Sequence, residues 1–215
     1  MDAITLLKED HKTVNALFRQ FEKLGDRAHS SKRKVVNQIV KELSIHAAVE
    51  ENVFYPAVKG ISDDLRDDVL EALEEHHVVK WLCSELAGMA PDEERFDAKV
   101  TVLIENVRHH VDEEETELFP RVRAVLGRNA LREIGDLLAE AKAVAPTRPH
   151  PKAPDEPPFN VIAGSVAALI DRVRDAGAGV VADAKRAAKG TTPGRTASRR
   201  RRPTRRRSPA TSPTR

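Results

Sequence analysis

One segment of this chain occurs twice and constrains the fold more than any other feature. The two copies are His46–Pro56 (HAAVEENVFYP) and His110–Pro120 (HVDEEETELFP). Each has a His, a Glu four residues later, a second Glu directly after it, and an aromatic–Pro pair in the same register. Positions four apart lie on the same face of a helix, so each copy points an imidazole and a carboxylate in one direction. Two such helices facing each other would form a mixed nitrogen–oxygen metal site.

Apolar residues recur at helical spacing through the first 145 positions, and five helices are expected. The first ends near Gly25, the second is capped by Ser30 or Ser31 and ends near residues 56–60, and the third is capped by Ser62 and ends near Gly88. The fourth begins around Asp92 and runs toward Pro120, and the fifth spans about 128–143. No strand-like alternation and no hairpin turn is apparent in the sequence.

The spacing of the duplicated segment indicates how the helices pair. The copies are 64 residues apart, which is about two helices plus their loops. A weaker echo relates Asp10–His11 to Glu75–His76, each followed by similar apolar positions. The pattern predicts an all-α, up-down-up-down four-helix bundle with a short fifth helix. Each helical hairpin contributes one lone His and one His-x3-Glu pair.

The amino-acid composition indicates the fold class and the cellular compartment. Hydrophobic residues are 40% and aromatics 4%, which favours Ala-, Leu- and Val-rich helices. The single cysteine, Cys83, excludes an intrachain disulfide and fits a reducing compartment. Neither a signal peptide nor a membrane-spanning apolar run is apparent, so we expect a soluble, cytoplasmic protein.

Beyond the expected bundle at 1–145 the composition changes. Residues 146–158 hold six Pro and predict a semi-rigid linker, 159–190 return to helical spacing as an amphipathic helix, and 191–215 predict a disordered tail. This tail contains nine Arg and no acidic residue, so the net charge of +2 leaves −7 on residues 1–190. The tail is dense enough in charge to bind nucleic acid or another polyanion non-specifically; the alternative is a solvated tail.

Six side chains are candidate metal ligands: His11, His46, Glu50, His76, His110 and Glu114. Imidazoles supply terminal nitrogen ligands, and carboxylates can bridge two cations and offset their repulsion. A set without thiolates suits iron or manganese better than a structural zinc site. Facing helices of a bundle are the usual place for such a dinuclear centre.

These residues resemble the hemerythrin-like family of HHE cation-binding domains, whose pattern is His … His-x3-Glu … His … His-x3-Glu. The resemblance covers about residues 1–140. It implies a four-helix bundle holding a non-haem di-iron centre (Fe2+/Fe3+, oxo- or hydroxo-bridged), with iron favoured over manganese or zinc. Glu50 and Glu114 would be the bridging carboxylates, and an open position would receive O2, hydrogen peroxide or NO.

One position departs from this pattern. Oxygen-carrying hemerythrins have a second His four residues after the third-helix His, where this chain has Lys80. A lysine is a poor ligand at neutral pH, so one metal ion would keep more room for solvent or substrate. Its ammonium is instead expected to act from outside the ligand set, donating a hydrogen bond to a bound anion. The departure favours redox chemistry or sensing over reversible oxygen storage.

Other residues allow two readings. His76 is preferred over His77 as the third-helix ligand because it keeps the register of His11. His109 is out of register and is expected to be solvated or to lie behind the ligands. Glu51 and Glu115 either orient ligand histidines or lie on a solvated face. Tyr55 either donates to the site or packs in the core. Trp81 and Cys83 are expected in the core or at its boundary.

The function predicted from these features is binding or reaction with O2, hydrogen peroxide or NO in oxidative or nitrosative stress, with peroxide- or NO-consuming activity. Two alternatives stay open. The bundle could be an iron- or oxygen-responsive sensor that signals through the C-terminal extension, or the protein could be nucleoid-associated through its Arg-rich tail. The sequence leaves the oligomeric state open.

Overall fold

The computed structural model describes residues 1–150, and every regular element in that range is a helix. The helices are α1 (Ala3–Glu22), α2 (His29–Val49), α3 (Tyr55–Val58), α4 (Asp63–Gly88), α5 (Phe96–Glu113), α6 (Phe119–Val125) and α7 (Arg128–Val144). Two π-helical turns, η1 (Glu50–Phe54) and η2 (Glu114–Leu118), join α2 to α3 and α5 to α6. The predicted C-terminal helix and tail, and most of the predicted linker, lie outside the described residues.

Capping explains where several helices begin. Ser62 accepts a hydrogen bond from the Leu65 N–H at 3.2 Å, which confirms it as the cap of α4, and Asp2 caps α1 through the Thr5 N–H at 2.9 Å. The predicted Ser30 or Ser31 cap of α2 is wrong, because that helix already begins at His29 without a side-chain cap.

The start predicted for the fourth helix, around Asp92, is also wrong. Helix α5 begins at Phe96, because residues before it form two turns instead. The carboxylate of Glu93 accepts from the Ala90 N–H, and the Glu93 carbonyl accepts from the Phe96 N–H at 3.0 Å. These bonds hold the chain in turns up to the first residue of α5.

The two π-helical turns fall on the duplicated segment. The Tyr55 N–H donates to the Glu50 carbonyl, and the Phe119 N–H donates to the Glu114 carbonyl, each five residues back. Pro follows each aromatic residue and lacks the N–H that would make the ordinary α-helical bond, so the wider turn is accommodated there. Such π-bulges are frequent at functional sites. Both copies therefore carry the same backbone distortion at the candidate ligand Glu.

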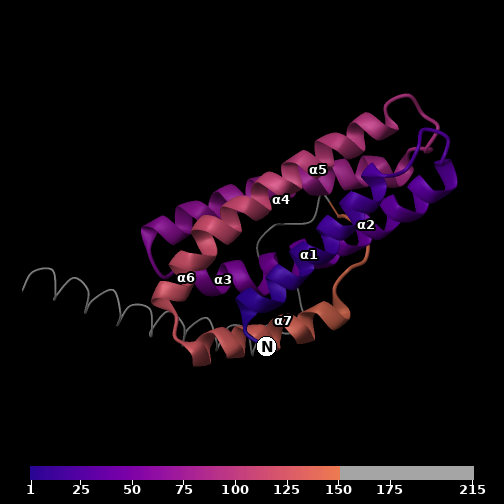
Figure 1. Ribbon diagram of the computed structural model, residues 1–215. Helices are drawn as coiled ribbons and strands as arrows, with labels where there is room; N and C mark the ends of the chain where they lie inside the picture. Colours follow the sequence, from indigo (N-terminus) through magenta and orange to yellow (C-terminus); the bar gives the residue numbers. More distant parts are fainter. Residues whose placement is uncertain (151–215) are drawn as a thin grey trace, which may run out of the picture.

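The long helices pack as two hairpins, α1 with α2 and α4 with α5, and Figure 1 shows the second hairpin lying over the first. Helix α7 runs along α1 and also packs against η1 and α2. Among the described residues no helix is long and apolar enough to cross a membrane. The long helices thus present their inner faces to one another, as the repeat spacing predicts.

The interior consists of two apolar clusters. One joins the start of α1 to α3, α6 and α7, and includes Leu7 and Leu138; the other joins the rest of α1 to α2, the end of α4 and α5, and includes Phe18 and Leu103. Along α1 the first cluster ends with Leu7 and the second begins with Val14, so His11 lies between them. A layer of buried polar side chains thus separates two apolar cores.

Helix α7 approaches the N-terminus very closely at Gly135. A Cβ built on Gly135 would come 2.8 Å from the Ala3 nitrogen and nearer still to the Met1 carbonyl oxygen. Only a residue without a side chain fits there. The glycine therefore sets the distance between α7 and α1.

Candidate metal centre

Four imidazoles meet in the buried layer, one from each long helix. His11 comes from α1, His46 from α2, His76 from α4 and His110 from α5, and each is 3–6% exposed. The rings of His11 and His46 have centroids 4.9 Å apart, and those of His76 and His110 are 4.7 Å apart. The histidines predicted from sequence are therefore brought together as two adjacent pairs.

Two buried carboxylates connect these pairs. Glu50 is fully buried, and its Oε2 lies 3.1 Å from Nε2 of His46 and 3.4 Å from Nε2 of His76. Oε2 of Glu114 lies 3.3 Å from Nε2 of His11 and 3.6 Å from Nε2 of His110. Each Glu therefore touches histidines of both pairs, the position that a bridging carboxylate needs.

The donor atoms form two groups with the spacing of metal ligands. His11, His46, Glu50 and Glu114 offer atoms within 4.8 Å of one another, and so do Glu50, His76 and His110. Glu50 belongs to both groups. The arrangement thus has room for two cations that share at least one carboxylate.

Several polar atoms in the buried layer lack a hydrogen-bond partner, as expected of metal ligands. Both oxygens of Glu50, Oε2 of Glu114 and Nε2 of His11 and His46 are buried without a hydrogen-bond partner. A buried polar atom without a partner costs about 1–3 kcal/mol, so a native structure rarely leaves several together. The unpaired atoms are the oxygen and nitrogen donors that a divalent cation binds, so the residues present fit a metal centre.

Carboxylates behind the histidines hold the rings in place. Nδ1 of His11 lies 2.9 Å from Oε1 of Glu115, and Nδ1 of His76 lies 3.0 Å from Oε1 of Glu51. An Nδ1–H that donates to a carboxylate leaves Nε2 as the ligand atom and raises its basicity. The structure therefore favours the orienting role for Glu51 and Glu115 over the solvated-face alternative.

Two further acids complete this arrangement. Glu75 Oε2 lies 2.8 Å from Nδ1 of His110, within hydrogen-bonding distance, whereas Asp10 Oδ2 lies 3.8 Å from Nδ1 of His46 and makes no hydrogen bond to it. Each of the four acids adjoins a candidate ligand in sequence and faces the histidine of a neighbouring helix. The four contacts form a closed ring: from α1 to α2, from η1 to α4, from α4 to α5, and from η2 back to α1. The acids before His11 and His76 were visible in the sequence, but only the packing shows which ring each one holds.

Lys80 lies behind His76. Its Nζ is 3.0 Å and 3.1 Å from the two carboxylate oxygens of Glu51, and both side chains are about nine-tenths buried. Lys80 therefore acts on the carboxylate that orients His76. Donation from Lys80 to a bound ligand remains a prediction.

Tyr55 both packs in the core and reaches the site. It is 1% exposed, and its hydroxyl donates to Oε1 of Glu114 at 2.9 Å, with Nε2 of His76 at 3.3 Å. Phe119 stacks on His11 with ring centroids 5.8 Å apart. The aromatic residues of the duplicated segment thus line the site on the side of the first apolar core.

Burial and neighbouring charges together shift the pKa values of the buried layer. Burial lowers the pKa of His46 to about 4, so this ring is neutral near pH 7 and free to act as a ligand. Burial and the nearby Glu114 raise the pKa of Glu50 well above its usual value. Burial acts in the same direction on Glu114, but the charges of His110 and His11 and the contact with His11 outweigh it and lower the pKa of Glu114.

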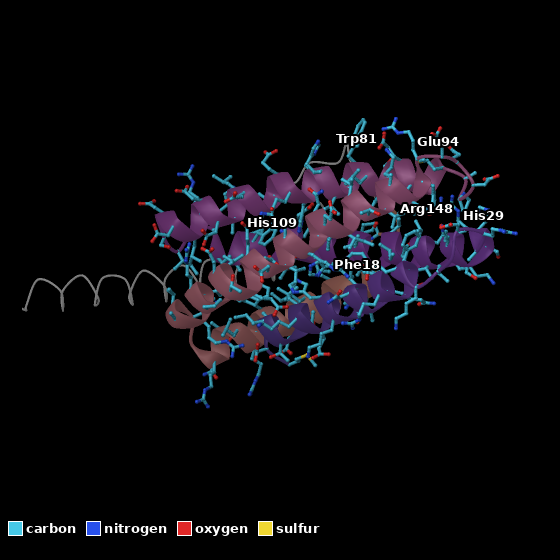
Figure 2. The ribbon with its side chains drawn as sticks, turned by 45° about the horizontal axis from the view of Figure 1, so that its top comes forward. Phe18, His29, Trp81, Glu94, His109 and Arg148 are labelled. Carbon is cyan, nitrogen blue, oxygen red and sulfur yellow. The ribbon has the colours of Figure 1, made fainter. Side chains whose placement is uncertain are left out.

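The remaining sequence candidates lie elsewhere. His77 and His109 are exposed, so His76 and His110 are the members of each His-His pair that face the layer. Cys83 is buried, and burial raises the pKa of its thiol to about 12. Trp81 is 52% exposed and points away from the bundle in Figure 2, so the prediction that it lies in or near the core is wrong. Trp81 lies on the face of α4 that is turned away from the neighbouring helices.

An all-helical bundle whose buried layer presents convergent His and Glu ligands defines a class of metal-binding helical proteins. Residues 2–122 match the family model of the hemerythrin HHE cation-binding domain. The match covers more than half of the chain, and the protein belongs to this family.

Two relatives extend the comparison. An uncharacterised hemerythrin-like protein of Schizosaccharomyces pombe is 29% identical over 168 residues, covering 78% of this chain and 82% of the relative. A DNA nickase of Nostoc sp. is 30% identical over 123 residues, covering 57% of this chain and 34% of that protein. The chain thus spans most of the first relative but only about a third of the second.

A solved structure supports the fold. The crystal structure of a hemerythrin HHE cation-binding domain-containing protein from Mycobacterium kansasii superposes with a TM-score of 0.58 at 23% identity. The similarity covers 67% of this chain and 86% of that one. At this identity the comparison establishes the hemerythrin-like fold alone.

Proposed function

We propose that the chain is a non-haem di-iron protein that binds or reacts with O2, hydrogen peroxide or NO. The carrying observation is the layer in which four histidines and two glutamates converge from four helices with unpaired donor atoms. The absence of a thiolate from this layer of the described residues favours iron over zinc. The stress role and the identity of the small ligand are part of the same proposal.

A bound iron pair would supply adjacent Lewis-acidic, redox-active ions with positions open to a small ligand. The protein residues prepare that chemistry. Glu115, Glu51 and Glu75 accept hydrogen bonds at Nδ1 of His11, His76 and His110, so Nε2 of each of these rings faces the interior. Glu50 and Glu114 supply negative charge between the two ligand groups, and the Tyr55 hydroxyl holds one oxygen of Glu114 in place. The apolar cores on both sides keep bulk water from the layer.

Lys80 supports reaction over storage. Its contact with Glu51 places a cation behind His76 where oxygen carriers of the family have another ligand. The ligand group around His76 offers three donors and the group around His11 offers four, with two imidazole nitrogens in each. A less saturated metal position is the more reactive one, and we infer that a substrate binds on the His76–His110 side.

The test is anaerobic reconstitution with Fe2+, followed by stopped-flow mixing with O2, peroxide and NO in turn. We expect two iron ions per chain and a near-ultraviolet charge-transfer band on oxidation. Lys80→His should slow the reaction with peroxide and favour reversible O2 binding. A chain that holds well under two irons, or that shows no such band, contradicts the proposal.

A second candidate function concerns DNA. The nine Arg at 191–215 and the match to a DNA nickase favour a nucleic-acid role, although that match covers 34% of the relative. Deleting 191–215 should abolish retention on DNA at low salt and leave iron binding intact. Retention that survives the deletion would exclude the tail as the contact.

A further inference from the structure

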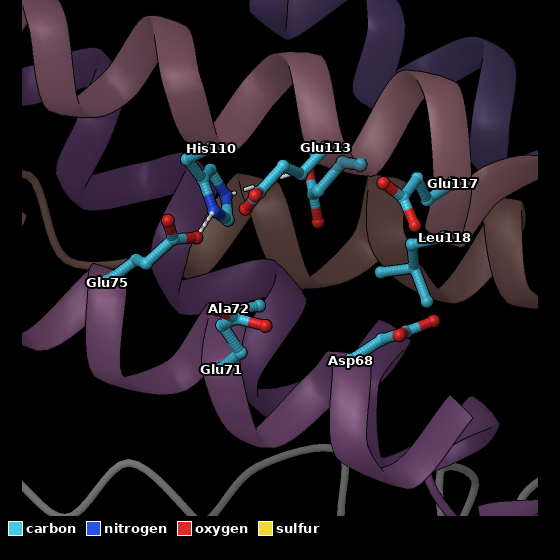
Figure 3. A pocket seen from close by; sticks show the side chains of 9 residues that line it. Asp68, Glu71, Ala72, Glu75, His110, Glu113, Glu117 and Leu118 are labelled. Carbon is cyan, nitrogen blue, oxygen red and sulfur yellow. Dashed lines mark hydrogen bonds and ion pairs between the residues drawn. The ribbon is translucent and has the colours of Figure 1, made fainter. Parts of the chain in front are cut away.

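A cleft leads from the surface to the candidate centre. Figure 3 shows it between α4 and the segment formed by α5 and η2, and its volume is about 100 Å³. His110 and Glu114 line its inner end, so the buried layer is reached from outside at this place. The outer lining comes from acidic residues of α4, α5 and η2.

The charge of this acidic cleft is one-sided. Its six carboxylates are Asp68, Glu71, Glu75, Glu113, Glu114 and Glu117. None of the residues that line it in the described part of the chain is Lys or Arg. Arg121 at the rim lies 2.7 Å from Asp68 and 2.9 Å from Glu117, but one guanidinium does not balance six carboxylates. A cleft lined by one sign of charge raises the local concentration of counter-ions.

A second observation points to a cation as the ligand of the acidic cleft. Glu114 is 2% exposed and lines the cleft, and its Oε2 has no hydrogen-bond partner. The row of carboxylates that lines the cleft therefore leads inward to a buried oxygen that has no hydrogen-bond partner. O2, hydrogen peroxide and NO carry no net charge for the carboxylates to attract, whereas a divalent cation is attracted strongly.

An outer group of ligands lies beside the cleft. Glu75, His109 and Glu113 offer atoms within 4.8 Å of one another, and Nε2 of His109 lies 3.3 Å from Oε1 of Glu113. His109 and Glu113 repeat the His-x3-Glu spacing of His110 and Glu114, shifted by one residue toward the N-terminus. The two pairs therefore alternate along the end of α5 and the start of η2. Glu75 belongs to the outer group and also contacts His110, which connects the two.

We propose that divalent cations reach the buried centre through the acidic cleft and bind first, transiently, at Glu75, His109 and Glu113. From there they move inward to His110 and Glu114. The outer group assigns a role to the out-of-register His109. This inference rests on the proposed metal-binding function, but it concerns the rate of loading and not the final occupancy.

The test mixes metal-free full-length protein with Co2+ in a stopped-flow spectrometer and follows visible absorption, with occupancy measured by calorimetry. His109→Ala/Glu113→Gln should lower the bimolecular loading rate about tenfold and leave two ions per chain at equilibrium. Its loading rate should also depend less on ionic strength than that of the unaltered protein.

The control is Glu94→Gln/Glu105→Gln, which removes two exposed carboxylates outside the cleft and should load at the unaltered rate. Equal rates for all three proteins, each with two ions bound, would overturn the loading route and leave the proposed function standing. A control as slow as the cleft variant would show general attraction and also overturn it. Unaltered protein that binds well under two ions would defeat the proposed function itself.

Discussion

The sharpest test of the buried layer is Glu50→Gln, because the structure predicts opposite effects on the metal-free and metal-bound protein. Glu50 is fully buried, and neither oxygen has a hydrogen-bond partner. Its Oε2 lies 3.1 Å from Nε2 of His46, on a ring whose pKa burial lowers to about 4. Near neutral pH the metal-free protein therefore contains a poorly compensated buried carboxyl.

The magnitude follows from this geometry. An unsatisfied buried group costs about 1–3 kcal/mol, and the Gln amide can donate to His46 without a charge. We expect Glu50→Gln to raise the unfolding free energy of the metal-free protein by about 2 kcal/mol. For a chain of this length that is roughly 4–8 °C in Tm. With metal at about 100 times its Kd, each occupied site adds about 2.7 kcal/mol to the unfolding free energy of the unaltered protein. The variant lacks the shared carboxylate, so we expect it to lose most of this stabilisation by metal.

The effect also depends on pH with a definite sign. Because the folded-state pKa of Glu50 is raised above its ordinary value of 4.5, the native state binds more protons than the unfolded state between these two pH values. This contribution to stability is present below pH 4.5 and is lost as the pH rises through the folded-state pKa. The advantage of the variant should therefore grow with pH across that window.

The assay is thermal and urea denaturation followed by circular dichroism, in chelator and in excess Co2+, from pH 4 to 8. Glu105→Gln, an exposed substitution on α5, is the control and should change neither series. If Glu50→Gln destabilises the metal-free protein, the reasoning about an uncompensated carboxyl is refuted. If the variant gains as much stability from metal as the unaltered protein, Glu50 is not a ligand.

Three further predictions concern residues around the layer. Lys80→Met should cost about 3 kcal/mol in urea unfolding because it leaves Glu51 buried without its cation, and adding Glu51→Gln should recover most of that loss; additive losses would contradict the pair. Gly135→Ala should lower stability by about 1–3 kcal/mol through its clash with the N-terminus, whereas Gly88→Ala, with open space around it, should not; equal Tm values would refute the close approach. Cys83 should resist a disulfide reagent at pH 8 until urea unfolds the chain, since burial raises its pKa to about 12, and rapid labelling of native protein would contradict its burial.

Local chemistry explains which parts of the fold were predictable. The helix cap at Ser62 and the end of α4 at Gly88 depend on residues within one turn, so the sequence pattern predicts them correctly. The predicted start of α5 was wrong because the turns before Phe96 depend on the Glu93 side chain, which folds back to accept a hydrogen bond from the Ala90 N–H. The π-helical turns were missed as well, although the aromatic–Pro pair that accompanies them was conspicuous.

The sequence by itself determined the family, the helical class and the six candidate ligands, because a His-x3-Glu spacing acts within a single helix. Only the tertiary structure decided which carboxylate holds which ring, that Lys80 lies on Glu51, and that an acidic cleft leads inward to Glu114. Those relations join residues on different helices, whose contacts depend on how the helices rotate and pack. The periodicity of one helix does not say how the neighbouring helix is rotated about its axis. That rotation is fixed when the helices pack to form the two apolar cores on either side of the polar layer.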